Sequence, residues 1–446
     1  MQFTSRMASA MLAACALAGA SPALHAETLA DIYVQARAHD PRFLATRAEF
    51  EASGFAVKEA RAGLLPSVGY QFGRVRTSQD ILHSENPVFA SGQATYPTKE
   101  HVLSVTQPLF RLSAWRGWKQ SQAAERQAAA AFAAAEQDLI VRSASAYMAV
   151  LAANDALALA RGEAEAIGRQ LELAETKFKS GQAIRGSVYD AQARHALIAS
   201  DVIAAENELA DRLQAVRELT GSVPAQLQPL QETLAIPAPD PLDPEAWVAL
   251  ALRQNLLLQA RIEAVDVARQ EIGRRKAGYY PTLDLSVSRN RRDTGGSLFG
   301  GGSDVNTNDI GIRLNVPLFE GGATKAQTGI ALKRFEAAEQ DLERDRRQVE
   351  RQTRAAYRGV VSGRVRVAAL DKSVLAFDSA RRLKDEGYKA GVSTVLAVLD
   401  AERDLYAARR DLAQARYDVA LDVLRLRQGA GTLNEEDLRL VSAQPR

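Results

Sequence analysis

The sequence has 446 residues, which at about 150 residues per domain suits two to four ordinary domains or one elongated one. Its 56 basic residues nearly balance 54 acidic ones, which argues against a nucleic-acid binder that works by bulk positive charge. The single cysteine, Cys15, excludes an intrachain disulfide, and no two of the five histidines have the spacing of a helical zinc pair. No stretch of the sequence has the residue spacing of a phosphate-binding loop, a calcium-binding loop or a catalytic triad. We therefore expect no cofactor, no metal site and no enzymatic activity.

The first 26 residues have the pattern of a secretory signal peptide. Arg6 provides a positive start, residues 7–19 form a short uncharged apolar stretch, and small residues lead to Ala26, after which we expect cleavage. A lipoprotein box at residues 12–15 is the alternative, in which Cys15 would be acylated. After residue 26 no run of 18 apolar residues occurs, so we expect no transmembrane helix, and any membrane crossing must use strands.

The rest of the chain contains two copies of one structural unit. Gly-Leu-Leu-Pro at 63–66 recurs as Gly-Tyr-Tyr-Pro at 278–281, and Phe-Lys-Ser-Gly at 178–181 recurs as Tyr-Lys-Ala-Gly at 388–391. The number of residues that separates a motif from its repeat differs by only a few between these two motifs, as one local insertion would produce. The predicted domains are the signal peptide 1–26, a first repeat 27–221, a Pro-rich linker 222–244, a second repeat 245–431 and a C-terminal tail 432–446.

Each repeat is predicted to run helix, strand, strand, long helix, turn, helix. In the second repeat a helix over 245–277 precedes a strand with alternating apolar residues at 283–287, a Gly-rich loop at 295–303 and a return strand at 310–316. Residues 324–389 contain no proline and predict a helix of about 100 Å, followed by a shorter helix to about Gln428. The first repeat has the same predicted order of elements as the second, and its return strand includes Leu103 and Val105.

The strands indicate a membrane environment. Alternation alone also suits a half-buried soluble sheet, but here two hairpins lie between very long helices and nothing else is available to cover them. The residues we expect to face lipid are Val68, Tyr70, Phe72, Leu283, Leu285, Val287, Ile310, Ile312 and Leu314. Because lipid tolerates no open sheet edge and four strands cannot close a useful barrel, other copies must complete it. Three copies give twelve strands and a lumen, so a channel would be a homotrimer.

The chain resembles the TolC family of trimeric outer-membrane channel-tunnels over its whole mature length. The resemblance rests on Pro-Leu-Phe-Glu-Gly-Gly at 317–322, Tyr-Lys-Ala-Gly at 388–391, Val-Leu-Asp-Ala at 398–401 and Gly-Thr-Leu-Asn-Glu-Glu-Asp-Leu at 431–438. It implies a mainly α fold with a small β part: four strands per chain complete a twelve-stranded membrane barrel, and long antiparallel coiled-coil helices form a periplasmic tunnel. It also implies three partners: outer-membrane lipid, a periplasmic adaptor (membrane fusion) protein and an inner-membrane transporter, which is either ABC or proton-driven. The role that it implies is type I secretion or drug efflux.

The resemblance also assigns sites at the periplasmic end. It places the adaptor-contacting tips at Ser180, Gly181, Ala390 and Gly391, and it makes Asp400 a candidate for an acidic ring at the pore constriction, with Asp190 the next candidate by repeat symmetry. The match is partial, because Ala397, Ser393 and Ser187 stand where TolC has charged residues.

An alternative from another class is a soluble periplasmic coiled-coil adaptor or scaffold. An adaptor would need no lipid-facing stripes, so the amphipathic hairpins discriminate between the two. The sequence does not identify the exported substrate.

Overall fold

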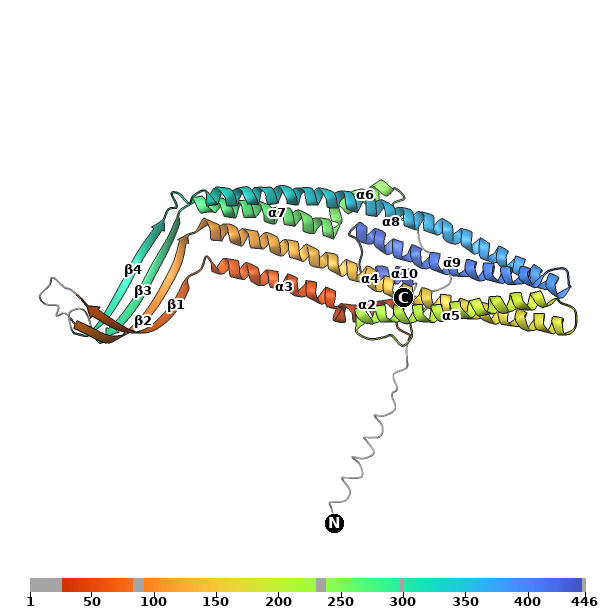
Figure 1. Cartoon of the computed structure of the whole chain (residues 1–446). Coiled ribbons are helices and arrows are strands. Elements are labelled where there is room, and N and C mark those ends of the chain that lie inside the picture. Colours follow the sequence, from red (N-terminus) through yellow and green to blue (C-terminus); the bar gives the residue numbers. More distant parts are fainter. Residues whose placement is uncertain (1–25, 83–91, 230–237, 297–300, 443–446) are drawn as a thin grey trace, which may run out of the picture. The chain divides into compact units, whose positions relative to one another are not determined.

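The structure is a computed structural model that describes residues 26–82, 92–229, 238–296 and 301–442. These residues are mainly helical, with one four-stranded sheet (Figure 1). The chain divides into two compact units. The helical unit comprises Met1–Thr46, Ala133–Asn255 and Arg347–Arg446, and the sheet unit comprises Arg47–Phe132 and Leu256–Arg346. Each unit therefore takes segments from both sequence repeats.

The sheet unit contains all four predicted strands in one antiparallel sheet of order β1-β2-β3-β4. The strands are β1 (Ser67–Ile81), β2 (Gly92–Phe110), β3 (Thr282–Thr294) and β4 (Ser303–Asn315). Because β2 pairs with β3, the two hairpins of the two repeats are joined side by side. A bulge between Pro108 and Phe110 accommodates a proline, which cannot donate to the ladder.

Helices lead to and from each hairpin. In the first repeat α3 (Pro41–Ala62) precedes β1 and α4 (Leu112–Lys179) follows β2. In the second, α7 (Leu256–Lys276) and the 3₁₀ turn η1 (Ala277–Tyr279) precede β3, and α8 (Ala323–Lys389) follows β4. The two long helices have 68 and 67 residues, about 100 Å each, and α8 confirms the helix predicted over 324–389.

The helical unit is built on the remaining helices and on the far halves of α4 and α8. They are α2 (Leu29–His39), α5 (Arg185–Thr220), α6 (Pro244–Gln254), α9 (Val395–Gly429) and α10 (Asp437–Ser442). Its buried side chains include Tyr147 of α4 and Leu424 of α9. The Tyr147 hydroxyl donates to the backbone carbonyl of Gln228, and Glu27 forms a parallel bridge with Leu227. Residues near the start of the predicted linker are thus held against Glu27, which follows the predicted cleavage site.

The helix predicted over 245–277 is interrupted, so that prediction was wrong in part. Asn255 has extended backbone angles and separates α6 from α7, and its side-chain amide donates to the Gly429 carbonyl at 3.0 Å. Gly431, with φ of 73°, lies so close that a Cβ there would overlap the Gln254 carbonyl oxygen. The first repeat has the same break, at Asp40 between α2 and α3, with the positive-φ Gly221 beside His39. In the second repeat the break accompanies tertiary contact with the end of α9, whereas in the first repeat Pro41 already favours an extended conformation for Asp40 before it.

One helix is more apolar than the sequence analysis expected. Within α4 an 18-residue window reaches a mean hydropathy of 1.2, and 44% of that window is buried inside the chain. The window is rich in alanine, and partial burial in helix packing is typical of a core helix.

Several predictions fall outside the described residues. The signal peptide up to residue 25, including Cys15, lies there, as do parts of the linker, of the Gly-rich loop at 295–303 and of the C-terminal tail.

Candidate functional site

The predicted lipid-facing residues lie on one face of the sheet. In the register Val68 of β1 is opposite Val105 of β2, which is opposite Val287 of β3, which is opposite Ile310 of β4. Side chains alternate between faces, so residues two apart share a face. The other predicted residues fall on this same face as Val68, together with Leu103. We call this the apolar face; its members Val68, Ile310 and Ile312 are 70%, 78% and 68% exposed.

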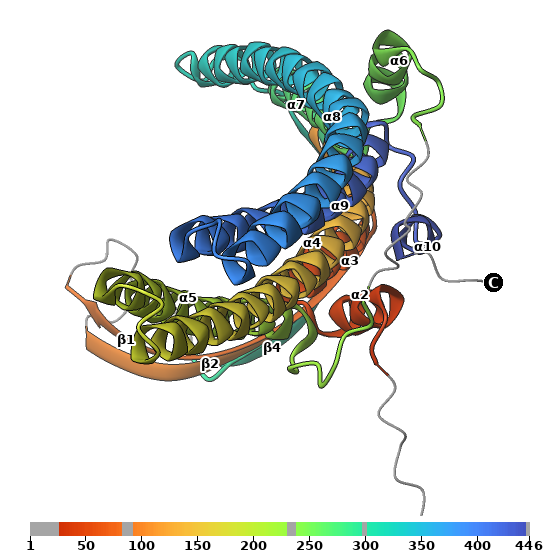
Figure 2. The same cartoon turned by 90° about the vertical axis from the view of Figure 1, so that its right-hand side faces the viewer.

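The opposite face is polar and more crowded. It carries Gly69, Gln71, Ser104, Ser286 and Gly311, and we call it the polar face. Along β3 the apolar-face residues from 287 to 291 are exposed, whereas the polar-face residues between them are half-buried. In a curved sheet (Figure 2), side chains crowd on the concave side, so the apolar face is the convex one.

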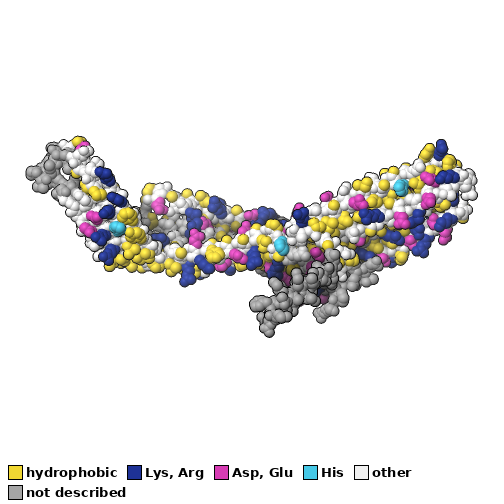
Figure 3. Space-filling model, turned by 90° about the horizontal axis from the view of Figure 1, so that it is seen from below, with side chains coloured by type: hydrophobic (Ala, Val, Ile, Leu, Met, Phe, Trp, Pro, Cys, Tyr) yellow, Lys and Arg dark blue, Asp and Glu magenta, His cyan; other side chains and the backbone are white. Residues whose placement is uncertain are grey.

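The apolar residues form a slanted band across the strands. Tyr70, in the middle of the β1 run, shares its register row with Leu103, Arg289 and Asn308, whereas the middle of the β4 run is Ile312. The band therefore shifts by four residues from β1 to β4, or about 13 Å along the strands over a sheet width of about 14 Å. The strands therefore make an angle of about 40° with the line perpendicular to the band. Strands in membrane barrels are tilted by the same amount from the membrane normal. Figure 3 shows hydrophobic side chains gathered on this end of the chain.

The sheet is open. Within the described residues β1 and β4 each pair on one side only, so the backbone N–H and C=O groups of two edges have no partner strand. Such edges are templates for pairing with another chain, and in lipid each unpaired group costs several kcal/mol.

The predicted tips are two helical turns of the same design in the helical unit. At the end of α4 the Gly181 N–H donates to Phe178 O and the Gln182 N–H to Lys177 O; at the end of α8 the Gly391 and Val392 N–H groups repeat this pattern. Both glycines have positive φ, 74° and 81°, a conformation that glycine adopts without strain where a helix ends and the chain reverses. Ser180 and Ala390 are the residues just before them and are exposed.

The two tips differ in their exposed apolar groups and caps. Val392 is 85% exposed after the second glycine, and Ile184 is 78% exposed before α5. Thr394 caps α9 by accepting from the Ala397 N–H at 3.2 Å, whereas Ile184 in the corresponding place gives α5 no side-chain cap. Exposed Val and Ile at helical turns are costly in water and available for contact with another protein.

The helices behind the tips pack together through a small core. It comprises Ile167, Ala174, Ala191, Ile198, Tyr388, Val395, Val398 and Leu399, from α4, α5, α8 and α9. The Lys177 ammonium donates to the Tyr388 carbonyl at 2.8 Å and lies 3.9 Å from the centroid of its ring. Burial raises the pKa of the Tyr388 hydroxyl. The two helical hairpins are thus locked to each other close to their turns.

The two candidate constriction residues have different surroundings. Asp400 on α9 accepts from Arg194 of α5 at 2.7 Å, lies 3.5 Å from Arg403, and its side chain is 40% exposed. Asp190 is exposed on α5, one helical turn before Arg194. The structure therefore compensates the charge of Asp400 within the chain. Sequence reasoning missed Arg194, although its i, i+4 spacing from Asp190 marked one face of the helix.

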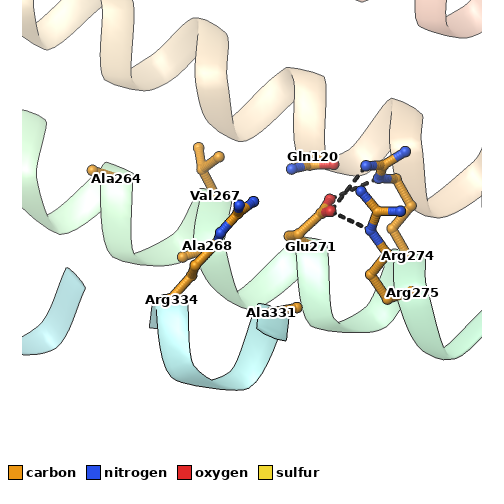
Figure 4. A pocket seen from close by; sticks show the side chains of 9 residues that line it. All are labelled: Gln120, Ala264, Val267, Ala268, Glu271, Arg274, Arg275, Ala331 and Arg334. Atoms are coloured by element: carbon orange, nitrogen blue, oxygen red, sulfur yellow. Dashed lines mark hydrogen bonds and ion pairs between the residues drawn. The ribbon is translucent and has the colours of Figure 1, made fainter. Parts of the chain in front are cut away.

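A groove of about 380 Å³ lies between α4, α7 and α8 in the sheet unit (Figure 4). Glu271 accepts from Arg274 at 2.7 Å and from Arg275 at 2.6 Å within it. Burial opposes ionisation of this carboxyl, but the hydrogen bonds and charges of the two arginines outweigh burial and lower its pKa to about 2. This ion cluster contains none of the predicted site residues. No group of three His, Cys, Asp or Glu that could hold a metal ion occurs within the described part of the chain.

Comparisons with known proteins agree with this geometry. A family model described as outer membrane efflux protein matches residues 32–222 and 247–432. The chain belongs to that family. The outer membrane protein TolC of Vibrio cholerae is 34% identical over 437 residues, which cover 97% of each chain. The alkaline protease secretion protein AprF of Pseudomonas aeruginosa is 34% identical over 93% of this chain and 86% of its own length.

The fold is also that of solved outer-membrane channels. The CmeC outer membrane channel of Campylobacter jejuni has a TM-score of 0.79 at 14% identity, with 92% of this chain and 89% of that chain covered. The family model and the two relatives confirm the resemblance to the TolC family. The protein is an outer-membrane channel for secretion or efflux that extends into the periplasm. The alternative of a soluble adaptor finds no support in these relatives.

Proposed function

We propose that three copies of the chain close their sheets into one twelve-stranded barrel whose lumen continues into a helical tunnel. The observation that carries this proposal is the open four-stranded sheet with an exposed apolar face. One chain leaves two unpaired edges, and two chains make eight strands with little interior beyond side chains. Three copies satisfy every edge and leave room for cargo.

The apolar face meets lipid in this barrel, and the polar face lines the lumen. Support comes from the slanted band, since its inclination of about 40° is the tilt that strands need to close a barrel. The predicted lipid-facing residues, from Val68 in β1 to Leu314 in β4, are exposed or half-exposed in the single chain. The glycines and hydroxyl residues of the polar face suit a water-filled interior.

The tips dock a periplasmic adaptor, which connects the tunnel to an inner-membrane transporter. Support comes from the exposed Ile184 and Val392 beside the two turns at Gly181 and Gly391. Apolar groups held on rigid turns bind a partner with little loss of conformational freedom.

The exported cargo includes proteins. AprF, which is named as an alkaline protease secretion protein, is 34% identical over almost the whole chain. In a strain that lacks its own channel of this kind, the chain should restore release of a protease made together with its transporter and adaptor. Restored resistance to small toxic compounds without restored protease release would assign the chain to efflux instead.

Cysteine cross-linking tests the barrel, because the chain after residue 26 has no native cysteine. Gln71→Cys in β1 is combined in turn with Thr307→Cys, Asp309→Cys or Gly311→Cys in β4. Within one chain these strands are separated by β2 and β3, about 14 Å, whereas a disulfide needs Cα atoms within about 7 Å. At least one pair should yield covalent dimers and trimers on oxidation of outer membranes. Absence of cross-linked species for every pair in correctly localised protein would overturn the proposal.

A further inference from the structure

The apolar face changes chemistry abruptly toward the hairpin loops. Just beyond the apolar band the same face carries a run of cationic side chains, which we call the basic band. Its members are Arg74 and Arg76 of β1, Lys99 of β2, and Arg289 and Arg291 of β3. On β4 the corresponding positions are Asn306 and Asn308. The lysine and arginine side chains on the sheet end are visible in Figure 3.

The basic band keeps an excess of positive charge. Lys99 pairs with Asp293 at 3.5 Å, and Arg291 pairs with Asp304 at 2.7 Å. Asp293 and Asp304 lie on the same face, and both are in the register row of Lys99. Arg74, Arg76 and Arg289 are exposed, and no ion pair forms for them within the described residues. Three guanidinium groups per chain are therefore available to an external anion.

Aromatic side chains mark the border between the two bands. The Tyr70 hydroxyl lies 2.8 Å from His101 Nδ1, and the Phe72 ring is 4.9 Å from the His101 ring. Aromatic rings with a polar end settle at the level of lipid headgroups and form girdles around membrane barrels. Because Arg74 follows Phe72 on the same face, the basic band begins at headgroup level.

The lipid headgroups at the level of the basic band belong to the outer leaflet. The basic band lies on the loop side of the apolar band, and α3, α4, α7 and α8 join the strands on the other side. Since the helical part extends into the periplasm, the loop side faces the exterior.

We propose that the basic band binds the phosphate groups of the phosphorylated glycolipid that forms the outer leaflet. This inference rests on the proposed orientation of the sheet, with its apolar face toward lipid. Guanidinium groups bind phosphate oxygens in bidentate fashion, and this arrangement is stronger and more specific than a neutral hydrogen bond. Arg74 and Arg76 lie two residues apart on the same face of β1, so their like charges repel each other unless an anion lies between them. Phosphate therefore also stabilises the outer rim of the barrel.

Native mass spectrometry with defined lipids tests this. Purified protein is mixed with bisphosphorylated lipid A, with its dephosphorylated form, or with phosphatidylglycerol, and the lipid retained per trimer is measured. The wild type should retain the bisphosphorylated lipid at least tenfold better than the other two. The variant Arg74→Gln/Arg76→Gln/Arg289→Gln should lose this preference, whereas Arg292→Gln, which lies on the polar face of β3, should keep it.

The outcomes separate this inference from the proposed function. Equal retention of phosphorylated and dephosphorylated lipid, or unchanged retention by the triple variant, would refute the basic band as a phosphate site. Equal retention of phosphatidylglycerol would refute the glycolipid as its occupant. Loss of the trimer in the triple variant, with lipid preference intact in the remaining trimers, would show that the arginines bridge subunits. A wild type that is not trimeric would instead refute the barrel itself.

Discussion

An arginine in the centre of the apolar band should prevent stable insertion of the barrel. Ile312 is the middle residue of the β4 run, is 68% exposed in the single chain and lies opposite Leu285 of β3. In the proposed barrel its side chain reaches the bilayer midplane. Ile312→Arg therefore places a guanidinium group where no water or counter-ion is available.

The cost follows from depth and from symmetry. An arginine at the midplane of a membrane barrel costs about 2–4 kcal/mol, so three copies per trimer cost about 6–12 kcal/mol. That loss is comparable to the whole stability of an ordinary folded domain, about 5–15 kcal/mol. Leu285 would also lose its apolar neighbour across the strand pair.

Fractionation measures the effect, with Ser286→Arg as the matched control. Ser286 lies on the polar face in the same sheet, and β4 already carries Arg313 on that face. We expect Ile312→Arg to be depleted from the outer membrane at least tenfold, and Ser286→Arg to reach the membrane at wild-type levels. Equal depletion of both variants, or normal insertion of Ile312→Arg, would refute the assignment of the two faces.

Three further predictions concern the helices. Gly391→Ala should cost about 1 kcal/mol of stability because Gly391 has a positive φ. Gly431→Ala should lower the melting temperature much more than Gly391→Ala, since the added Cβ at Gly431 would also overlap backbone atoms. Equal losses of melting temperature in the two variants would contradict the proposed cause of the helix break at Asn255. Because the pKa of Glu271 is lowered in the folded state, its ionised carboxylate stabilises the fold above about pH 4.5, and this stabilisation should disappear as the pH falls toward 2. The variant Glu271→Gln should therefore lose less melting temperature on acidification than the wild type. An unchanged pH profile of the melting temperature in this variant would argue against the ion cluster. If Asp400 lines the constriction, Asp400→Asn should lower cation selectivity in planar bilayers and Arg194→Gln should raise it, whereas identical selectivity in both would leave Asp400 as a structural ion-pair residue.

The local pattern of the sequence predicts much of this fold because side-chain periodicity is set by the backbone. The two-residue alternation in 283–287 and 310–314 predicted both the strands and their shared face, and the absence of proline from 324–389 predicted α8 almost to the residue. The glycines at 181 and 391 were predictable because a helix reversal requires positive φ.

Other features depend on which surfaces meet in space. Nothing in the composition of 245–277 ends a helix at Asn255, because the break comes from contact with Gly429 and Gly431. The pairing of Asp400 with Arg194 likewise depends on how α5 packs against α9. The joining of the hairpins through β2 and β3 also required the tertiary arrangement, since it links strands of different repeats.

The central claim is that the open sheet of one chain is completed by two more copies. Native mass spectrometry of protein extracted from outer membranes in mild detergent tests it most directly. We expect a single species with the mass of three mature chains, which separates into unfolded monomers without a folded intermediate that retains the strands. A stable monomer or dimer with full strand content would contradict it.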